Sequence, residues 1–128
     1  MTEIDKKFRF RKFPVYIESR KFLFEIKKLA REKFPKYELF SLTNQLSRAA
    51  DSIILNIAEG SDRSSDKDFA HFLNLSHTSL NEVVACVDIA LDNKYISEDE
   101  HLVYLNKGAE LANQLTAFRN SLLKTPTK

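Results

Sequence analysis

The chain has 128 residues, a length typical of one domain, and its 43% hydrophobic and 30% charged residues with only two glycines and three prolines favour long helices. Its single cysteine, Cys86, excludes an internal disulfide, and no apolar run approaches the roughly 20 residues of a membrane-spanning helix. The first thirteen residues hold no apolar core, which argues against a secretory signal. We therefore expect residues 1–128 to form one cytoplasmic domain, with an arm at residues 1–11 and a tail at residues 124–128.

The net charge of +2 conceals an uneven distribution along the chain. Residues 1–48 hold thirteen Lys or Arg against six Asp or Glu, whereas residues 49–128 hold seven against twelve. One interpretation is a solvated basic face balanced by acidic faces elsewhere. The other is a cationic surface that attracts a polyanion.

Aromatic and basic residues alternate in the segment FRFRKF at residues 8–13. Such alternation fits a short extended strand, or an unfolded tail that stacks on and pairs with nucleic acid. The interpretation that we favour is an arm whose phenylalanines pack on its own bundle or on a neighbouring subunit. Arg9, Arg11 and Lys12 are candidate nucleic-acid contacts in this segment.

The first long helix is predicted at residues 14–34, with Pro14 in its first turn, where a missing N–H costs nothing. Its inward residues recur at helical spacing: Val15, Ser19, Phe22, Ile26 and Leu29. The opposite face carries Arg20, Lys27, Lys28 and Arg31, with Lys21 beside them. These five cations are the main candidates for nucleic-acid binding. Ile17 and Phe24 lie among these cations, which predicts that another subunit covers them.

The second helix is predicted at residues 39–59, after the break at Phe34-Pro35, with Gly60 as a left-handed stop. Its buried residues are predicted to be Leu42, Leu46, Ala49, Ile53 and Ile57. A polar stripe runs beside them: Gln45, Arg48, Ser52, Asn56, Glu59 and Arg63.

The polar stripe has two interpretations. It can form a buried network with Ser79 and Glu82 that sets the register of the helices, or it can contact a ligand or RNA. In the network interpretation, Arg48 and Glu82 face each other in a largely buried pair, and Asn56 bonds to Ser79 or Ser76.

The third helix is predicted at residues 66–92, capped by Ser65, with Asn93 as its left-handed terminator. The capping box at residues 97–100 starts a fourth helix that extends to about residue 123. The expected inner face of that fourth helix is Leu105, Ala109, Ala112, Leu115, Phe118 and Leu122. Four such helices with short connections predict an all-α, up-down-up-down antiparallel four-helix bundle.

No nucleophile elbow, phosphate loop or zinc-ligand spacing occurs in the sequence. His71, His77 and His101 are interpreted as surface residues, and Cys86 as a small core residue. The paired carboxylates stand at helix starts, where the helix dipole accounts for them. We therefore expect no catalytic residue, no metal site and no cofactor, and a protein that is not an enzyme.

The segment FPKYELFSLTNQLSRAADSIILNIAEGSDRSSDKDFAHFL, followed by SLNEV and NKYI, resembles a bacterial four-helix-bundle family. That family includes the 23S rRNA intervening-sequence protein and the accessory protein of diversity-generating retroelements. The resemblance covers residues 8–123, with Thr78 and Asn93 standing where the family commonly has glycine. The matching positions are Phe34-Pro35, Glu38, Leu42, Gln45, Arg48-Ala49, Ser52, residues 56–60, Arg63, Ser79 and Glu82.

This resemblance implies a four-helix protomer that assembles as a homopentameric ring. For the retroelement relative it implies a cationic barrel that binds nucleic acid and a reverse transcriptase; for most members it implies no established activity. Two hypotheses therefore stand: an oligomer that binds RNA through the basic first helix, or an interaction scaffold for a protein partner with no nucleic-acid role.

Overall fold

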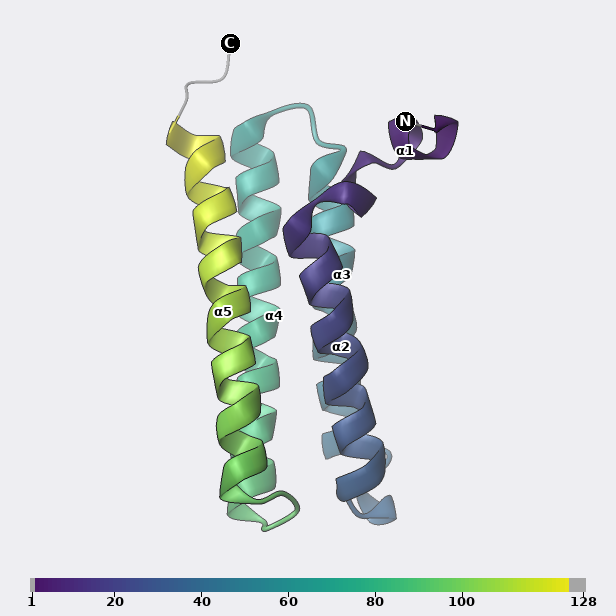
Figure 1. Ribbon diagram of the computed structural model, residues 1–128, viewed down its shortest axis with the longest axis vertical. Helices are drawn as coiled ribbons and strands as arrows, with labels where there is room; N and C mark the ends of the chain where they lie inside the picture. The colour runs from purple at the N-terminus through teal and green to yellow at the C-terminus, as the bar shows by residue number, and fades with distance from the viewer. Residues whose placement is uncertain (1, 125–128) are drawn as a thin grey trace.

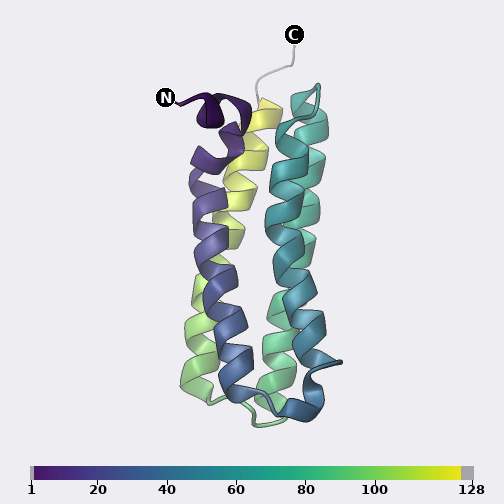
Figure 2. The same ribbon diagram turned by 90° about the vertical axis from the view of Figure 1, so that its right-hand side faces the viewer.

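Four long helices run alternately up and down the molecule and enclose one apolar core (Figures 1 and 2). In the computed structural model, which describes residues 2–124, these helices are α2 (Pro14–Lys33), α3 (Leu42–Ser61), α4 (Asp66–Asp92) and α5 (Glu98–Lys124). Of the predicted tail at residues 124–128, Lys124 belongs to α5 and the other residues lie outside the described part of the chain. Three short elements complete the fold: α1 (Glu3–Lys7) and the 3₁₀ turns η1 (Arg9–Lys12) and η2 (Lys36–Glu38). No strand occurs within residues 2–124, and the predicted all-α bundle is confirmed.

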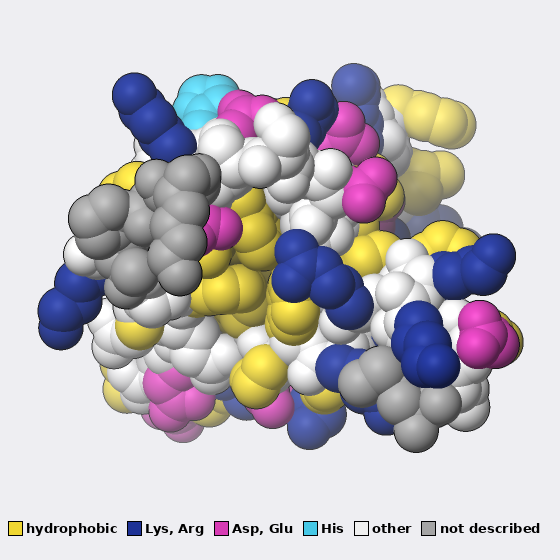
Figure 3. Space-filling view, turned by 90° about the horizontal axis from the view of Figure 1, so that it is seen from above, with side chains coloured by type: hydrophobic (Ala, Val, Ile, Leu, Met, Phe, Trp, Pro, Cys, Tyr) yellow, Lys and Arg dark blue, Asp and Glu magenta, His cyan; other side chains and the backbone are white. Residues whose placement is uncertain are grey.

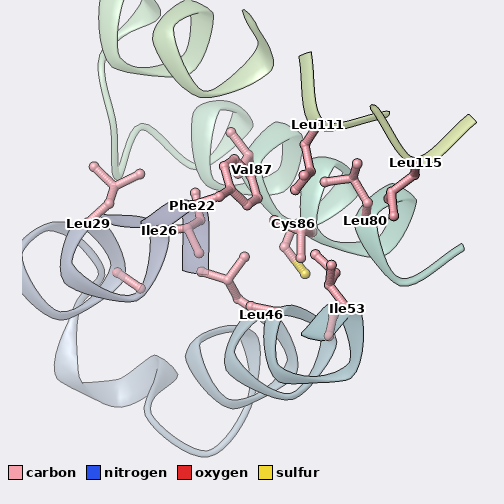
Figure 4. Close-up of a cluster of buried hydrophobic side chains, with 14 of the residues drawn as sticks. Phe22, Ile26, Leu29, Leu46, Ile53, Leu80, Cys86, Val87, Leu111 and Leu115 are labelled. Atoms are coloured by element: carbon pink, nitrogen blue, oxygen red, sulfur yellow. The ribbon is translucent and has the colours of Figure 1, made fainter. Parts of the chain in front are cut away.

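The core consists of the apolar faces of the four long helices, which meet along the bundle axis (Figure 4). The predicted inward residues of α2 and α3 are all buried, from Val15 to Leu29 and from Leu42 to Ile57. Helical periodicity locates these faces because side chains three and four positions apart lie on one side of a helix. Cys86 is buried among them, and burial in apolar surroundings raises the pKa of its thiol.

The buried face of α5 differs from the prediction. Gly108, Leu111 and Leu115 are its buried residues, whereas Ala109 is exposed. The prediction was wrong at Ala109 because Gly108, which has no side chain, was not counted as a core position. Gly108 instead lies opposite Val84 and Leu80 of α4, at the packed side of the helix.

The start of α3 also differs from the prediction, by three residues. A side-chain cap explains the shift: the Glu38 carboxylate accepts hydrogen bonds from the Ser41 hydroxyl and, at 3.3 Å, from the Leu42 backbone N–H. The Tyr95 hydroxyl donates a further bond of 2.7 Å to the same carboxylate, and the bonds from Ser41 and Tyr95 lower the pKa of Glu38. Glu38 therefore starts α3 and ties it to the connection between α4 and α5.

The prediction that Gly60 terminates α3 was wrong. Gly60 lies inside the helix, is buried, and has no left-handed backbone. A Cβ atom at this position would meet Phe72 Cβ at 2.6 Å and Phe69 Cδ1 at 2.9 Å. Glycine is therefore required for the close approach of α3 to α4, and the helix continues to Ser61.

The left-handed residue after α4 is Lys94, with φ 61°, and not Asn93, which has φ −85°. Lys94 N–H bonds to the Leu91 carbonyl at 2.9 Å, and Tyr95 N–H bonds to the Ala90 carbonyl at 2.9 Å. This is the Schellman arrangement, in which the residue after the C-cap adopts positive φ. The prediction was wrong by one position because Asn93 instead uses its side chain to bond the Ile89 carbonyl at 2.9 Å.

Replacing Lys94 with glycine is expected to raise the free energy of unfolding by about 1 kcal/mol. A left-handed backbone costs roughly 1–2 kcal/mol for a residue with a Cβ. Glycine avoids most of that cost, and its greater freedom in the unfolded chain offsets only part of the gain. Urea denaturation of the two proteins measures the difference. Asn93→Gly should not produce the same gain, since Asn93 is not left-handed; a larger gain there would contradict this assignment.

The predicted N-terminal arm is in fact folded against the bundle. The structure has a short helix at Glu3–Lys7, and a 3₁₀ turn at Arg9–Lys12 in the segment for which an extended strand or an unfolded tail was an alternative. The helix forms because Thr2 and Asp5 make a capping box. The Phe10 ring contacts the Tyr16 ring at 5.0 Å, so part of the segment packs on its own bundle, in agreement with the interpretation that we favoured.

Candidate nucleic-acid interface

The outward face of α2 carries four exposed cations, which we call the cationic α2 face: Arg20, Lys21, Lys28 and Arg31. Lys21 and Lys28 approach only carboxylates of their own helix, Glu18 at 3.4 Å and Glu32 at 3.9 Å. Such exposed ion pairs contribute little to the stability of the protein and are weak, so both charges remain available to a ligand. Among the described residues, no carboxylate forms an ion pair with Arg20 or Arg31, and Arg20 lies 5.9 Å from the Tyr16 ring centroid.

Lys27, which was predicted to belong to this surface, is committed to the fold. Its Nζ lies 2.6 Å from Asp51 Oδ1 of α3, and the lysine side chain is only 28% exposed. Lys33 and Glu100 at 3.5 Å, and Lys107 and Glu25, similarly join α2 to α5. The bond to Glu25 raises the pKa of Lys107. The cations of α2 thus divide into those that hold the helix in place and those that face outward.

The N-terminal cations have different environments. Arg9 donates a hydrogen bond of 2.7 Å from Nη2 to the Ser61 carbonyl at the end of α3, and its guanidinium lies 5.6 Å from the Phe13 ring centroid. Lys12 approaches Asp5 at 3.6 Å, while Arg11 is exposed. Arg9 therefore fastens the N-terminal segment to the bundle, and Lys12 stabilises the fold of the segment itself.

Apolar side chains interrupt the cationic α2 face. Ile17 is 40% exposed and Phe24 is 65% exposed, and they line a shallow groove with Leu23 of α2 and Ile54 of α3. A large exposed aromatic ring beside other apolar residues is a feature of surfaces that bind a partner. The structure thus places both predicted interface residues on the same side of the molecule as the cations.

The polar stripe of α3 separates into three groups rather than one network. In the first, the Ser79 hydroxyl of α4 bonds the Ser52 hydroxyl at 2.9 Å, and Asn56 bonds the same hydroxyl at 3.0 Å. The predicted bond from Asn56 to Ser79 or Ser76 is absent among the described residues: Asn56 bonds Ser52, and Ser76 donates to the Ile53 carbonyl at 2.8 Å. These small polar residues join α3 to α4, with Ser76 and Ser79 buried and Ser52 and Asn56 half-buried.

The second group is the surface pair of Glu59 and Arg63, whose side chains meet at 2.7 Å near the end of α3. The Arg63 guanidinium also lies over the Phe72 ring of α4, 4.5 Å from its centroid. Both partners are substantially exposed, so the pair was wrongly placed in a buried network. The pair with Glu59 instead holds the Arg63 side chain against α4.

The third group corrects the predicted buried pair of Arg48 and Glu82. Both side chains are exposed, as is Gln45, and they line an open groove between α3 and α4 with Ser52. The described residues include no ion pair between Arg48 and Glu82. The loss of about 3–5 kcal/mol that follows from unpairing a buried charge is therefore not expected for Glu82→Ala. Spacing alone identified the shared face but could not show that it is open to solvent.

Within residues 2–124, no cluster of three or more His, Cys, Asp or Glu is arranged to hold a metal ion. His101 contacts Asp88 at 2.7 Å between α5 and α4. No helix in the described part of the chain combines the length and apolarity needed to cross a membrane.

Comparison with known protein families shows to which family this four-helix bundle belongs. The family model described as 23S rRNA-intervening sequence protein matches residues 11–117. The chain belongs to this family. A crystal structure from the S23 ribosomal protein family, of a Bacteroides thetaiotaomicron protein with unknown function, has the same fold, with a TM-score of 0.75 and 24% sequence identity over 83% of this chain and 95% of that one. A comparison with curated protein sequences finds no match.

In this member of the 23S rRNA-intervening sequence family, one surface feature was missed by the sequence analysis. Residues 6–10 and residues 55–63 form a groove at the end of the bundle, where Lys and Arg side chains gather on the side of α1 (Figure 3). Lys6, Lys7 and Phe8 belong to it and were not named as site residues. Their basic and aromatic character was visible in the sequence, but their proximity to the end of α3 arises only in the folded chain.

Proposed function

We propose that this protein is a non-enzymatic, cytoplasmic homo-oligomer that binds RNA through the cationic α2 face. The supporting observation is that Arg20, Lys21, Lys28 and Arg31 are exposed on one side of a single long helix, opposed only by weak pairs within that helix. At 1.5 Å per residue, Arg20 and Arg31 lie about 16 Å apart along the helix axis. This distance allows contact with several phosphates of a nucleic-acid backbone.

The proposed recognition is electrostatic and reads little sequence. Arginine and lysine neutralise phosphates and release the counterions condensed on the nucleic acid, which supplies affinity without contact to base edges. Repeating the cationic α2 face in an oligomer strengthens binding further, because several weak contacts to one RNA act together. The family resemblance implies five copies, and we adopt a pentamer as the working assembly.

Subunit contact and RNA binding share one side of the molecule in this proposal. Ile17 and Phe24 would pack against a neighbouring copy, while the long arginine and lysine side chains keep their charged ends in solvent at the edge of the contact. The exposed apolar area also supports the second candidate, an interaction scaffold in which Ile17 and Phe24 dock a protein partner such as a reverse transcriptase and no nucleic acid binds.

Reversing Arg20 and Arg31 to glutamate is expected to weaken binding to every structured RNA by a similar factor. Each lost phosphate contact should also reduce the slope of log affinity against log salt by about one. Fluorescence anisotropy with two RNAs of unrelated sequence, between about 50 and 200 mM salt, measures both quantities. Lys27 is left unchanged, because its pair with Asp51 belongs to the fold.

The matched control is Lys67→Glu with Lys124→Glu, which changes the net charge equally at exposed positions on α4 and α5. This control should retain most of the affinity. Equal weakening by both double variants would show that net charge, and not the cationic α2 face, governs binding. If the unaltered protein binds no RNA at about 50 mM salt, where electrostatic binding is strong, the scaffold replaces this proposal.

A further inference from the structure

We propose that the groove between the N-terminal segment and the end of α3 binds one unpaired nucleotide of an RNA, with the Phe8 ring as its stacking surface. We call it the N-terminal groove; its principal lining residues are Lys6, Lys7, Phe8, Arg9, Leu55 and Arg63. The inference rests on the proposed RNA binding but assigns it a second site, distinct from the cationic α2 face. Its volume of about 650 Å³ lies within the range of small-molecule sites.

The first argument is the fixed position of the groove walls. Phe10 packs edge-on against Tyr16, with the two ring centroids 5.0 Å apart. Phe8 in turn packs edge-on against Phe10, with ring centroids 6.4 Å apart and an interplanar angle of 72°. Arg9, between them in sequence, bonds the Ser61 carbonyl at 2.7 Å. The aromatic segment is thereby held against the end of α3, so that a ligand does not have to order it.

The second argument is the exposure of Phe8. Phe8 is 48% exposed although it lies in a groove, and Leu55, on the opposite wall, is also exposed. Apolar surface inside a concavity is better covered by a flat ring than left in water. A nucleobase supplies such a ring, and stacking on an aromatic side chain accepts any base.

The third argument is electrostatic. Four cations line the groove against two carboxylates, Glu59 and Asp62. Glu59 is engaged by Arg63 at 2.7 Å, and Lys6 approaches Glu3 outside the groove at 3.6 Å. Of the described residues, none forms an ion pair with Lys7, which lies next to Phe8 in sequence. Lys7 can therefore contact the phosphate of a nucleotide whose base stacks on Phe8.

An unpaired nucleotide fits these observations better than a paired one. A base within a duplex is already stacked on both faces and cannot present its ring to Phe8, whereas a base in a loop or single strand can. A positively charged groove that contains an aromatic side chain is the general arrangement of single-strand binding surfaces. The partner class is therefore RNA with accessible unpaired bases.

The test compares Phe8→Ala, Phe8→Tyr and the control Phe40→Ala. Phe40 is 90% exposed and follows η2 in the connection between α2 and α3. This connection lies at the opposite end of the bundle from α1 (Figure 1). We expect Phe8→Ala to weaken binding to a short oligouridine by about tenfold, Phe8→Tyr to restore it, and Phe40→Ala to have little effect. Binding to a fully paired RNA of equal length should be unchanged in all three variants.

A second measurement probes the groove without RNA. Uridine monophosphate is titrated into the isotope-labelled protein at millimolar concentration, and amide signals of residues 6–10 and 58–63 are followed by NMR. Shifts confined to these residues support the groove even if RNA binding at the cationic α2 face fails.

If RNA binds but Phe8→Ala weakens paired and unpaired RNA equally, or changes neither, the nucleotide site is refuted while the proposed function stands. If Phe8→Ala instead lowers the oligomer mass and leaves RNA affinity unchanged, the groove is a subunit contact and the proposal is wrong.

Discussion

Gly60→Ala is expected to lower the free energy of unfolding by roughly 2 kcal/mol, although alanine is the better helix former. Within a regular helix, the substitution alone would stabilise by about 1 kcal/mol. Here the new Cβ would stand 2.6 Å from Phe72 Cβ, well inside the roughly 3.5–4.0 Å of a normal carbon contact. Phe72 Cβ is attached directly to the backbone of α4 and cannot rotate away, so α3 and α4 must separate, which costs more than the helical gain.

Gly108→Ala is the matched control, because it is also a buried glycine within a long helix. A Cβ there would meet Val84 Cγ2 at 3.5 Å and Leu80 Cδ1 at 3.9 Å, which are ordinary contacts. We expect this variant to be more stable than the parent by about 0.5–1 kcal/mol. Thermal and urea denaturation of both variants should therefore give changes of opposite sign. Stabilisation by both would show that α3 and α4 do not approach as closely at Gly60 as the structure has them.

Phe22→Ala is expected to have the largest effect, a loss of about 3–5 kcal/mol in the free energy of unfolding. Phe22 is 5% exposed and lies in the core with Ile26, so its truncation removes a buried ring and leaves a cavity. Circular dichroism during urea denaturation measures the loss. A change below about 1 kcal/mol would contradict the placement of this ring in the core.

Phe24→Ala provides the comparison, two residues along the same helix. Phe24 is 65% exposed, so its removal should change the stability of the protomer by at most about 0.5 kcal/mol. Its effect should appear in assembly: light scattering at micromolar concentration is expected to give a mass several times 14.8 kDa for the parent protein and a lower mass for Phe24→Ala. A parent mass near that of one chain would refute the proposed oligomer, and an unaltered mass in the variant would place the contact elsewhere.

Local signals in the sequence determined the four long helices and most of their buried faces. The bounds of α4, Asp66–Asp92, agree with the prediction because Ser65 caps its first turn through a short-range hydrogen bond of 3.0 Å to Asp68 N–H. The predicted buried residues of α3 are correct because the 3.6-residue period is a property of that helix alone and can be recognised without reference to its neighbours. The all-α architecture was accessible in the same way, whereas the family was indicated by the resemblance of residues 8–123 to known sequences and not by local signals.

The tertiary structure decided which polar residues are available for function. Lys27 and Lys28 are adjacent and chemically identical in the sequence, yet Lys27 pairs with Asp51 of α3 while Lys28 stays exposed. Arg48 and Glu82 share a groove but remain open to solvent, a difference in burial that spacing cannot express. The physical reason is that the interaction of a charged side chain depends on its distance from charges on other helices and on its exposure to solvent. The periodicity of one helix determines neither of these quantities.

The same distinction applies to glycine and to the N-terminal groove. Gly60 reads as a helix stop from its residue type, but the close approach of Phe72 shows that it serves the packing of α3 on α4. The groove joins residues 6–10 to residues 55–63 through the Arg9 bond to Ser61, a contact between positions 52 residues apart. Sequence alone determined that basic and aromatic residues occur in the N-terminal segment; only the folded chain brought them to the end of α3, because long-range contacts arise from the packing of whole helices.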